Sequence, residues 1–267
     1  MNVTKRVLVT NDDGIDSEGI RVLTAMLVEH GYEPIVIAPD SDYSGAGTSI
    51  IGKGVSSINA GQRELGYEKR VLAEAPDVEA YAVAAPPAMC TLLSMRGAFG
   101  QRPDLVASGI NLGLNTGPAV RHSGTVAAAL TAAGFGVPAL AISAEHPFDG
   151  SDTPLRYDTA AAIAMQLLAV LPGSRHQVLN LNVPCCSLDE IAGVQAATVS
   201  TVTNFYSQVE ERTDSVLKIG FAVSDNAVPA GSDSALVTAG FAAVSSLVGI
   251  GTTECGDLIT RLAETAA

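Results

Sequence analysis

The sequence predicts an α/β protein: a three-layer α/β/α sandwich around a mainly parallel, Rossmann-like sheet, with a smaller C-terminal portion of extended segments. The main observation is that short apolar segments with the length of buried strands alternate with longer segments whose apolar residues recur at helical spacing. Composition agrees, because 47% of the residues are hydrophobic and only 4% are aromatic, as expected for a core of Ala, Val, Leu and Ile around a parallel sheet. The 267 residues suffice for one large α/β core.

The first strand, turn and helix set the pattern for the rest of the chain. Residues 6–10 predict a short buried strand, residues 11–17 a polar turn, and residues 18–30 a helix with an apolar stripe. Residues 49–83 are irregular and suggest a β-rich excursion from the main sheet. The remaining strands are expected at residues 33–38, 104–110, 138–144 and 178–183, and the remaining helices at residues 87–99, 124–136 and 155–171.

The alternation of strands and helices weakens after Pro184. We therefore expect an α/β core at residues 1–192 and a C-terminal portion at residues 193–267. The second portion is expected to consist of extended segments around turns and to end in a helix near residues 254–264.

Charge and composition exclude several classes of function. The formal net charge of -13 would repel a polyanion, so duplex nucleic acid is not expected as a partner, whereas a small phosphorylated substrate fits if a bound cation reverses the local field. The four cysteines form no C-x-x-C pair and no zinc-finger spacing. The chain starts without a secretory apolar segment, and its most apolar stretch, residues 126–143, is interrupted by Gly134, Gly136 and Pro138, so we expect a cytoplasmic protein without a membrane span.

Polar side chains follow the predicted strands at the edge of the sheet where parallel strands end. Ligands of open parallel sheets bind at this edge, which draws attention to residues 11–14, 42–45 and 108–113. The adjacent carboxylates of Asp12 and Asp13 repel each other there, and a divalent cation would compensate the cost of burying them. The other donors in these loops are hydroxyl and amide oxygens, which suit Mg²⁺ or Mn²⁺ better than zinc.

A predicted helix N-terminus supplies a further element of the site. Ser123 and Thr125 stand at its start, and Gly124 permits close approach of the backbone. We expect free amides there, which together with the helix dipole would bind an anion. A cation on one side and this helix on the other would hold a phosphoryl group and stabilise its transition-state charge.

Five motifs together resemble the signature of the SurE family: Val-Thr-Asn-Asp-Asp-Gly-Ile at 9–15, Ala-Pro-Asp at 38–40, Ser-Gly-Ala at 44–46, Pro-Asp-Leu-Val-Ala-Ser-Gly-Ile-Asn at 103–111, and Ser-Gly-Thr-Val-Ala-Ala-Ala at 123–129. The resemblance implies an α/β/α nucleotidase or acid phosphatase that needs a divalent cation and associates through an exchanged C-terminal arm. We accordingly expect a homodimer or homotetramer.

The resemblance also implies roles for individual residues. One divalent ion per subunit, Mg²⁺ or Mn²⁺, would activate a water that attacks a nucleoside monophosphate or a related small phosphate ester, without a covalent protein intermediate. The expected metal ligands are Asp12, Asp13, Ser44 and Asn111. The candidate catalytic residues are Asp12, Asp13, Asn115 and Ser123. The candidate phosphate-binding residues are Asn11, Gly45, Ser108, Gly109, Ser123, Gly124 and Thr125.

Two departures from the family pattern leave alternatives open. Residues 85–90 read Ala-Pro-Pro-Ala-Met-Cys where relatives usually carry Gly-Thr-Pro-x-Asp-Cys, and Asp42-Tyr43 replaces basic or amide residues before Ser44. The chain could therefore be a phosphatase of a specialised biosynthetic pathway, or a non-catalytic nucleotide or metabolite sensor on the same scaffold. His122 could protonate a leaving oxygen or lie at the surface, and Arg121 could contact substrate or only offset acidic charge.

Overall fold

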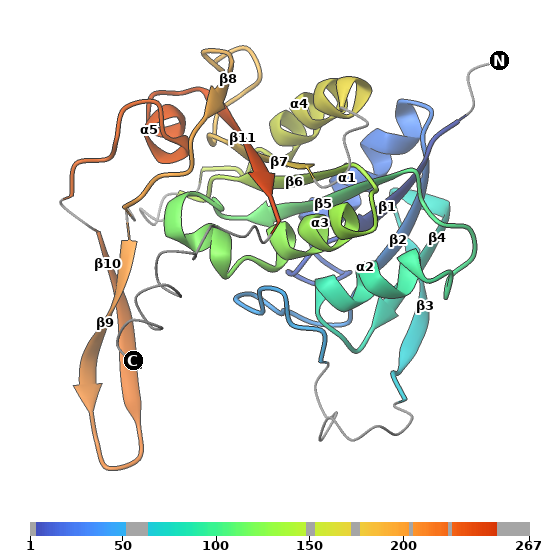
Figure 1. Ribbon diagram of the computed structural model, residues 1–267, viewed down its shortest axis with the longest axis horizontal. Helices are drawn as coiled ribbons and strands as arrows, with labels where there is room; N and C mark the ends of the chain where they lie inside the picture. Colours follow the sequence, from blue (N-terminus) through green and yellow to red (C-terminus); the bar gives the residue numbers. More distant parts are fainter. Residues whose placement is uncertain are drawn as a thin grey trace, which may run out of the picture.

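In the computed structural model, the described residues are 4–51, 64–147, 153–171, 177–202, 205–223 and 226–249. These residues form a nine-stranded sheet with the order β3-β4-β2-β1-β5-β6-β7-β11-β8, flanked by helices, and a separate two-stranded sheet of β9 and β10 (Figure 1). The strands are β1 (Arg6–Thr10), β2 (Glu33–Pro39), β3 (Tyr67–Leu72), β4 (Ala75–Val83), β5 (Leu105–Leu112), β6 (Ala139–Ala144), β7 (Gln177–Val183), β8 (Val194–Ala197), β9 (Phe205–Arg212), β10 (Leu217–Val223) and β11 (Ala242–Val248).

The centre of the sheet is parallel and contains a topological switch point. Strands β4, β2, β1, β5, β6 and β7 pair in parallel, while β3 and β11 run antiparallel to β4 and β7. The chain passes from β1 to β2 on one side, and the later strand β5 pairs with β1 on the other side. A crevice outside the carboxyl ends of the strands is expected at such a reversal. The ends of β1 and β5 therefore mark the place where a ligand should bind.

Helices cover both faces of this sheet, as expected for the three-layer sandwich. One core cluster joins α1 (Glu18–Glu29) and α4 (Tyr157–Val170) to the sheet, and the other joins α2 (Pro87–Met95) and α3 (Gly124–Gly134) to the opposite face. Small side chains dominate α3, with Ala127, Ala128, Ala129, Ala132 and Ala133 all buried. The mainly parallel α/β/α prediction is thus confirmed, and the small side chains of α3 let this helix pack closely on the sheet.

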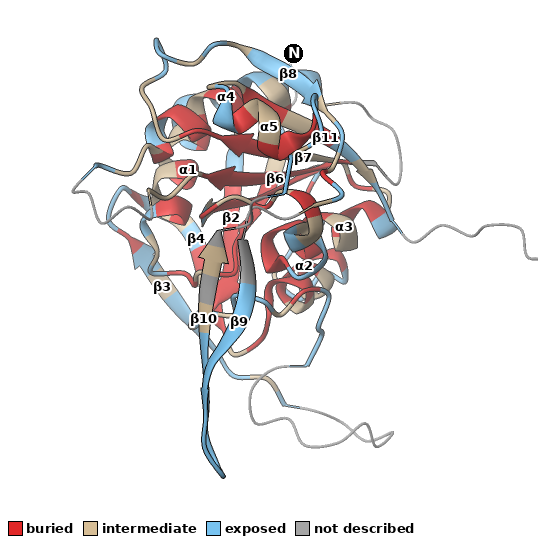
Figure 2. Ribbon diagram, turned by 90° about the vertical axis from the view of Figure 1, so that its left-hand side faces the viewer, coloured by how far each residue is buried: buried red, intermediate tan, exposed pale blue. Residues whose placement is uncertain are grey.

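The C-terminal portion both completes the sheet and extends away from it. Strand β11 lies between β7 and β8, and the short helix α5 (Asp233–Thr238) packs against β11. The hairpin of β9 and β10 projects from the body and is largely exposed (Figures 1 and 2). The predicted helix near residues 254–264 lies outside the described residues, as does part of the irregular segment at 49–83.

Two local differences from the sequence prediction concern the extent of β5 and the presence of α5. Strand β5 continues to Leu112, so Ser108 and Asn111 lie within the strand and not in a loop after it. The cause is an irregularity in the pairing of β5 with β6. Ser108 pairs with Ala141 and Asn111 pairs with Ser143, so β5 contains one residue more than β6 between these pairs, and pairing then continues. Helix α5 was not predicted, because six residues are too few to show a helical period. In the described part of the chain, no helix has the length and apolarity needed to cross a membrane.

Candidate active site

The two adjacent acidic residues lie at the carboxyl end of β1, beside the end of β5. Asp12 is buried and Asp13 is partly exposed. The backbone amide of Leu112 donates to Asp13 Oδ2 at 3.4 Å, which joins the turn after β1 to the end of β5. The backbone amide of Tyr43 donates to the carbonyl oxygen of Asp12 at 2.8 Å, which brings the loop after β2 to the same place. Three chain segments thus meet around the carboxylate pair.

The N-terminus of α3 holds the carboxylate of Asp12 by both oxygens. The backbone amide of Gly124 donates to Asp12 Oδ2 at 3.1 Å, and the hydroxyl of Thr125 donates to Asp12 Oδ1. Burial raises the pKa of Asp12, while the Thr125 hydroxyl and the amides of Gly124 and Thr125 act in the opposite direction. The helix N-terminus therefore offsets part of the cost of placing this carboxylate in the interior.

Gly124 is needed for this contact because no larger residue would fit. A Cβ atom at position 124 would lie 2.7 Å from the Asp12 Cβ and 2.9 Å from Pro87 Cγ, at the start of α2. The start of α3 is in this way packed directly on the aspartate and on the neighbouring helix. Replacing Gly124 would force Asp12 or α3 to move.

Asn111 presents an amide oxygen to the same space. Its Nδ2 donates to the carbonyl of Gly113 at 2.7 Å, which fixes the orientation of the amide. Its Oδ1 lies 3.3 Å from the Thr125 hydroxyl oxygen. Thr125 has one hydroxyl hydrogen, which goes to Asp12, so the Asn111 oxygen retains its lone pairs. Asp12 and Asn111 thus offer acceptor oxygens around a common point.

Asp13 carries the clearest electrostatic signal of the site. Burial and then the neighbouring charge of Asp12 raise the pKa of Asp13 to about 7, and the charge of Asp42 acts in the same direction. Among the described residues, no Lys, Arg or His side chain forms an ion pair with Asp12, Asp13 or Asp42. The negative charge of this cluster is therefore uncompensated by side chains of the described chain.

Ser44 stands on an exposed turn whose geometry is set by Asp42. The carboxylate oxygen Oδ1 of Asp42 accepts from the Ser44 amide at 2.7 Å and from the Ser44 hydroxyl at 2.6 Å. Because the hydroxyl hydrogen points at Asp42, the lone pairs of Ser44 Oγ remain free for another ligand. The loop is tied to the start of α3 by a 3.0 Å bond from the Gly47 amide to the carbonyl of His122.

Most of the sequence matches a known protein family. Residues 7–206 match the family model described as "Survival protein SurE". The chain belongs to the SurE family. A 5'-nucleotidase SurE from Xylella fastidiosa (strain 9a5c) is 36% identical over 192 residues, which cover 70% of this chain and 67% of that protein. Another, from Stenotrophomonas maltophilia (strain R551-3), is 32% identical over 248 residues, which cover 91% and 89% of the two chains.

The fold of the SurE family is also found by comparison of structures. The crystal structure of SurE protein from Aquifex aeolicus superposes with a TM-score of 0.75 at 25% sequence identity, and covers 98% of this chain and all of that chain. Family membership confirms the resemblance drawn from the motifs and the expectation of an enzyme that hydrolyses phosphoric monoesters. It also implies a divalent cation as cofactor.

The residues present fit such a cation. Asp12, Asp13 and Asn111 offer oxygen atoms, the donor type that Mg²⁺ and Mn²⁺ prefer. Three buried oxygens next to them in the chain or sheet, Thr10 Oγ1, Asn11 Oδ1 and Ser108 Oγ, have no hydrogen-bond partner in the described structure. Buried polar atoms are normally paired, so unpaired ones indicate a place completed by water or a ligand. Together with the uncompensated charge, they favour a hydrated cation at this edge of the sheet.

The expected phosphate-binding residues lie in different parts of the site and differ in burial and in hydrogen bonding. Ser123 caps α3, with its oxygen accepting from the Val126 amide at 3.1 Å. The expectation of free amides at this helix N-terminus is wrong: Gly124 donates to Asp12, Val126 to the Ser123 hydroxyl, and Ala127 to the Ser123 carbonyl. Sequence reasoning could not find this, because Asp12 lies 112 residues before Gly124.

Asn11, Gly45 and Gly109 complete the set of phosphate-binding candidates. Asn11 is buried and uses its amide nitrogen within its own turn, donating to the Gly14 carbonyl at 2.9 Å and to Ser17 Oγ at 2.7 Å. Gly45 is exposed on the Ser44 turn with φ of 80°. Gly109 lies in the irregular part of β5, where a Cβ would lie 2.3 Å from the carbonyl oxygen of Ile142. Their phosphate contacts remain predictions.

Asn115 belongs to a second buried polar network, on β6 and β7. Its amide nitrogen Nδ2 donates to Ser143 Oγ at 2.9 Å, and its backbone amide donates to Asn182 Oδ1 at 2.7 Å. Its carbonyl oxygen accepts from Asn180 and Asn182. Among the described residues, no hydrogen bond joins Asn115 to Asp12 or Asp13, and its catalytic role stays a prediction. Sequence reasoning did not single out Asn180 and Asn182, because their contacts with Asn115 join residues 65 and 67 positions apart.

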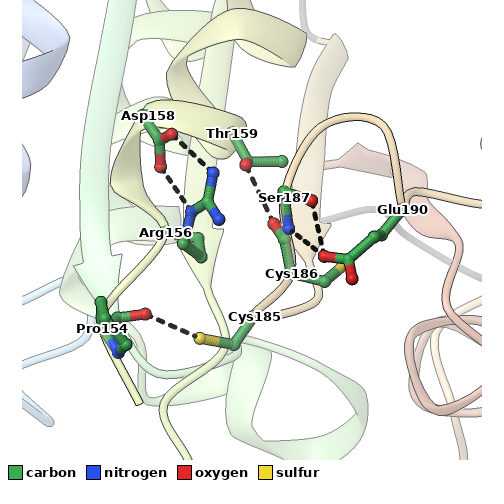
Figure 3. A network of polar contacts seen from close by, with 8 residues as sticks. All are labelled: Pro154, Arg156, Asp158, Thr159, Cys185, Cys186, Ser187 and Glu190. Carbon is green, nitrogen blue, oxygen red and sulfur yellow. Dashed lines mark hydrogen bonds and ion pairs between the residues drawn. The ribbon is translucent and has the colours of Figure 1, made fainter.

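Polar contacts beyond β7 fix the segment that follows these asparagines (Figure 3). The Thr159 hydroxyl donates to the carbonyl of Cys186 at 2.9 Å, and the Cys185 thiol donates to the carbonyl of Pro154 at 3.5 Å. Arg156 pairs with Asp158 at the start of α4. The end of β7 is thereby attached to α4, on the far side of the sheet from α3.

Proposed function

We propose that this chain is a divalent-cation-dependent phosphomonoesterase that hydrolyses nucleoside monophosphates, with one Mg²⁺ or Mn²⁺ held by Asp12, Asp13, Ser44 and Asn111. The observation that carries the proposal is the convergence of acceptor oxygens from the ends of β1 and β5, with no cationic side chain of the described residues paired to the carboxylates there. The related 5'-nucleotidases support the substrate class.

A bound divalent cation would supply Lewis acidity toward a phosphoryl oxygen and toward water. The residues of the chain prepare the site for that chemistry. Asp12 is held in one orientation by α3, and Asn111 is oriented by the Gly113 carbonyl. The Asp42 carboxylate accepts the Ser44 hydroxyl hydrogen, which leaves the lone pairs of Ser44 Oγ available to a cation. These contacts reduce the reorganisation needed when the charge of the transition state develops.

Ser123 is the best placed of the proposed phosphate contacts. Its oxygen accepts the Val126 amide, which uses a lone pair and leaves the hydroxyl hydrogen to be donated. It stands at the start of α3, one residue before the amide that holds Asp12. Donation of that hydrogen to a phosphoryl oxygen would place phosphate next to the carboxylate pair.

The C-terminal portion beginning at residue 193 is proposed to mediate association into a homodimer or homotetramer. Its hairpin exposes Val209, Leu217 and Ile219, at 61%, 56% and 57% of their accessible surface. Burial of these apolar side chains against a second chain would stabilise the association of the two chains.

The activity is tested by hydrolysis of a generic aryl phosphate and then of nucleoside monophosphates beside sugar phosphates, with Mn²⁺ or Mg²⁺ and with a chelator. We expect turnover with the cation, none with the chelator, and a preference for nucleotides. Asp12→Asn should lower kcat/KM by about 10³-fold, since the cation contributes several kcal/mol to the transition state. Asp16→Asn, an exposed acidic residue of the same turn, is the matched control and should retain activity.

Binding of a nucleotide without any turnover would contradict the proposal and favour a sensor. Comparable rates on all esters would contradict the nucleotide preference and leave a general phosphatase. A preference for a single non-nucleotide ester would instead favour a dedicated biosynthetic enzyme.

A further inference from the structure

Backbone amides at the start of α3 already donate hydrogen bonds to other groups of the protein. Gly124 N donates to Asp12, Val126 N to Ser123 Oγ and Ala127 N to the Ser123 carbonyl. Ser123 N itself donates to the carbonyl of Ala119 at 3.2 Å. The positive end of the helix therefore faces a carboxylate of its own chain, and that carboxylate already fills the place that a phosphate would take at an open helix N-terminus.

The Thr125 side chain is committed to the same carboxylate. Its hydroxyl has one hydrogen, which it donates to Asp12 Oδ1, and the residue is completely buried. A hydroxyl that donates to a carboxylate cannot donate the same hydrogen to a phosphoryl oxygen. The remaining lone pairs of Thr125 are acceptors, which a phosphate dianion would repel.

We propose that Thr125 and the Gly124 amide are positioning residues, which hold the carboxylate of Asp12 in the orientation that binds the cation, and that they are not phosphate ligands. The inference rests on the proposed function, since it assigns a role within the same cation site. It separates the Ser-Gly-Thr segment into two parts. Ser123 faces the substrate, while Gly124 and Thr125 face the metal ligand behind it.

The geometry explains why both groups are required. The amide of Gly124 reaches Oδ2 and the hydroxyl of Thr125 reaches Oδ1, so the carboxylate is fixed against rotation about its own axis. The absence of a side chain at Gly124 lets the helix approach to this distance, because a Cβ there would lie 2.8 Å from Asp12 Oδ2. Hydrogen-bond partners behind a metal ligand typically change metal affinity 10- to 100-fold.

The test is Mn²⁺ binding to the chain without substrate or phosphate, measured by titration calorimetry. Thr125→Val removes the hydroxyl and keeps the shape, and we expect Mn²⁺ affinity to fall by about 10- to 100-fold. Thr125→Ser restores the hydroxyl and should restore the affinity. Thr131→Val is the matched control. Thr131 lies on the same helix, and its hydroxyl donates to the carbonyl of Ala127 at 2.8 Å. The Mn²⁺ affinity of this variant should therefore equal that of wild type.

A second readout separates the two roles of Thr125. At saturating Mn²⁺, inhibition by inorganic phosphate should be nearly equal in Thr125→Val and wild type. Weaker phosphate inhibition together with unchanged Mn²⁺ affinity would overturn the inference and make Thr125 a phosphate ligand.

A double-mutant cycle in chelator tests the contact independently of metal binding. Thr125→Val should lower Tm by about 2–4 °C in the wild-type background, because Asp12 loses a buried donor, and should have little effect in an Asp12→Ala background. Equal effects in both backgrounds would overturn the inference. Failure of the wild type to bind Mn²⁺ would contradict the proposed function, while this cycle would still decide whether Thr125 holds Asp12.

Discussion

The two halves of the proposed cation site are held in place by different kinds of contact. The inner half, consisting of Asp12, Asn111 and Thr125, lies between the ends of β1 and β5 and the start of α3, where contacts join residues more than 100 positions apart. The outer half, consisting of Asp42 and Ser44, is an exposed turn held by bonds between residues two positions apart. The inner half thus depends on the whole fold, whereas the outer half depends on local sequence.

This difference predicts how substitutions in the two halves would affect cation binding and stability. A change in the inner half alters cation binding and folding together, because the same buried groups serve both. A change in the outer half alters cation binding with little effect on stability, because exposed turns contribute little to the free energy of unfolding. The following predictions test this separation.

Of the three substitutions Asn111→Ala, Asp42→Ala and His122→Ala, the first, in the inner half, is expected to have the largest effect. The substitution removes a proposed ligand and also the donor to the Gly113 carbonyl. We expect Mn²⁺ affinity to fall by about 100-fold or more, and stability to fall by about 1 kcal/mol. Calorimetric titration and denaturant unfolding measure the two quantities. A loss of affinity with wild-type stability would show that the inner half does not couple binding to folding.

The second prediction concerns the pH dependence of stability in chelator, which reports on Asp13. Its pKa is about 7 in the folded chain and 3.8 in a model peptide, so between these values the folded chain binds a proton that the unfolded chain lacks. The resulting stabilisation is present below about pH 4 and is lost as the pH rises through 7.

We therefore expect the Tm of wild type to fall more between pH 5 and pH 8 than the Tm of Asp13→Asn. Asp16→Asn, in the same turn, should behave as wild type. Parallel pH profiles for wild type and Asp13→Asn would show that Asp13 is not held at a raised pKa.

A smaller effect is expected in the outer half from Asp42→Ala. Loss of the acceptor frees the Ser44 hydroxyl to rotate, and loss of the charge weakens attraction of the cation. We expect Mn²⁺ affinity to fall by about 10-fold, while Tm changes by less than about 2 °C. Asp42→Asn keeps an acceptor oxygen, so its Mn²⁺ affinity should lie between that of wild type and that of Asp42→Ala. Asp40→Ala, on the same loop, serves as the control. A large fall in Tm would contradict the local character of this half.

The smallest effect is expected from His122→Ala. The side chain is exposed, and the contact of this residue with the Ser44 loop uses its backbone carbonyl, which the substitution retains. We expect kcat to change by less than about 3-fold. A fall of about 10²-fold or more, with loss of the alkaline-side pH dependence, would instead identify His122 as a general acid.

The sequence predicted much of the fold and drew attention to the candidate site residues, but it did not predict the contacts between them. Strands such as β1 and β6 and the helices α1 and α4 were predictable because their apolar residues follow regular periods. The position of Asn111 inside β5 was not, because a ladder irregularity is set by pairing with β6. The insertion of β11 between β7 and β8 likewise depends on long-range pairing.

The contacts of Thr125 and Asp42 differ in how far the sequence could predict them. A Ser-Gly-Thr at a helix start predicts free donors, and only the fold shows that the Thr125 hydroxyl donates to Asp12. Asp42 was noted only as a departure from the family pattern. Its position two residues before Ser44 is typical of an Asx turn, so local sequence contained a signal for that contact.

The central claim is that Asp12, Asp13, Ser44 and Asn111 share one hard cation. The most direct measurement is anomalous scattering from crystals grown with Mn²⁺. We expect a single anomalous peak per chain at the ends of β1 and β5, within about 2.0–2.6 Å of oxygen atoms from these four side chains. A Mn²⁺ peak elsewhere, or one that contacts neither Asp12 nor Asp13, would contradict the account.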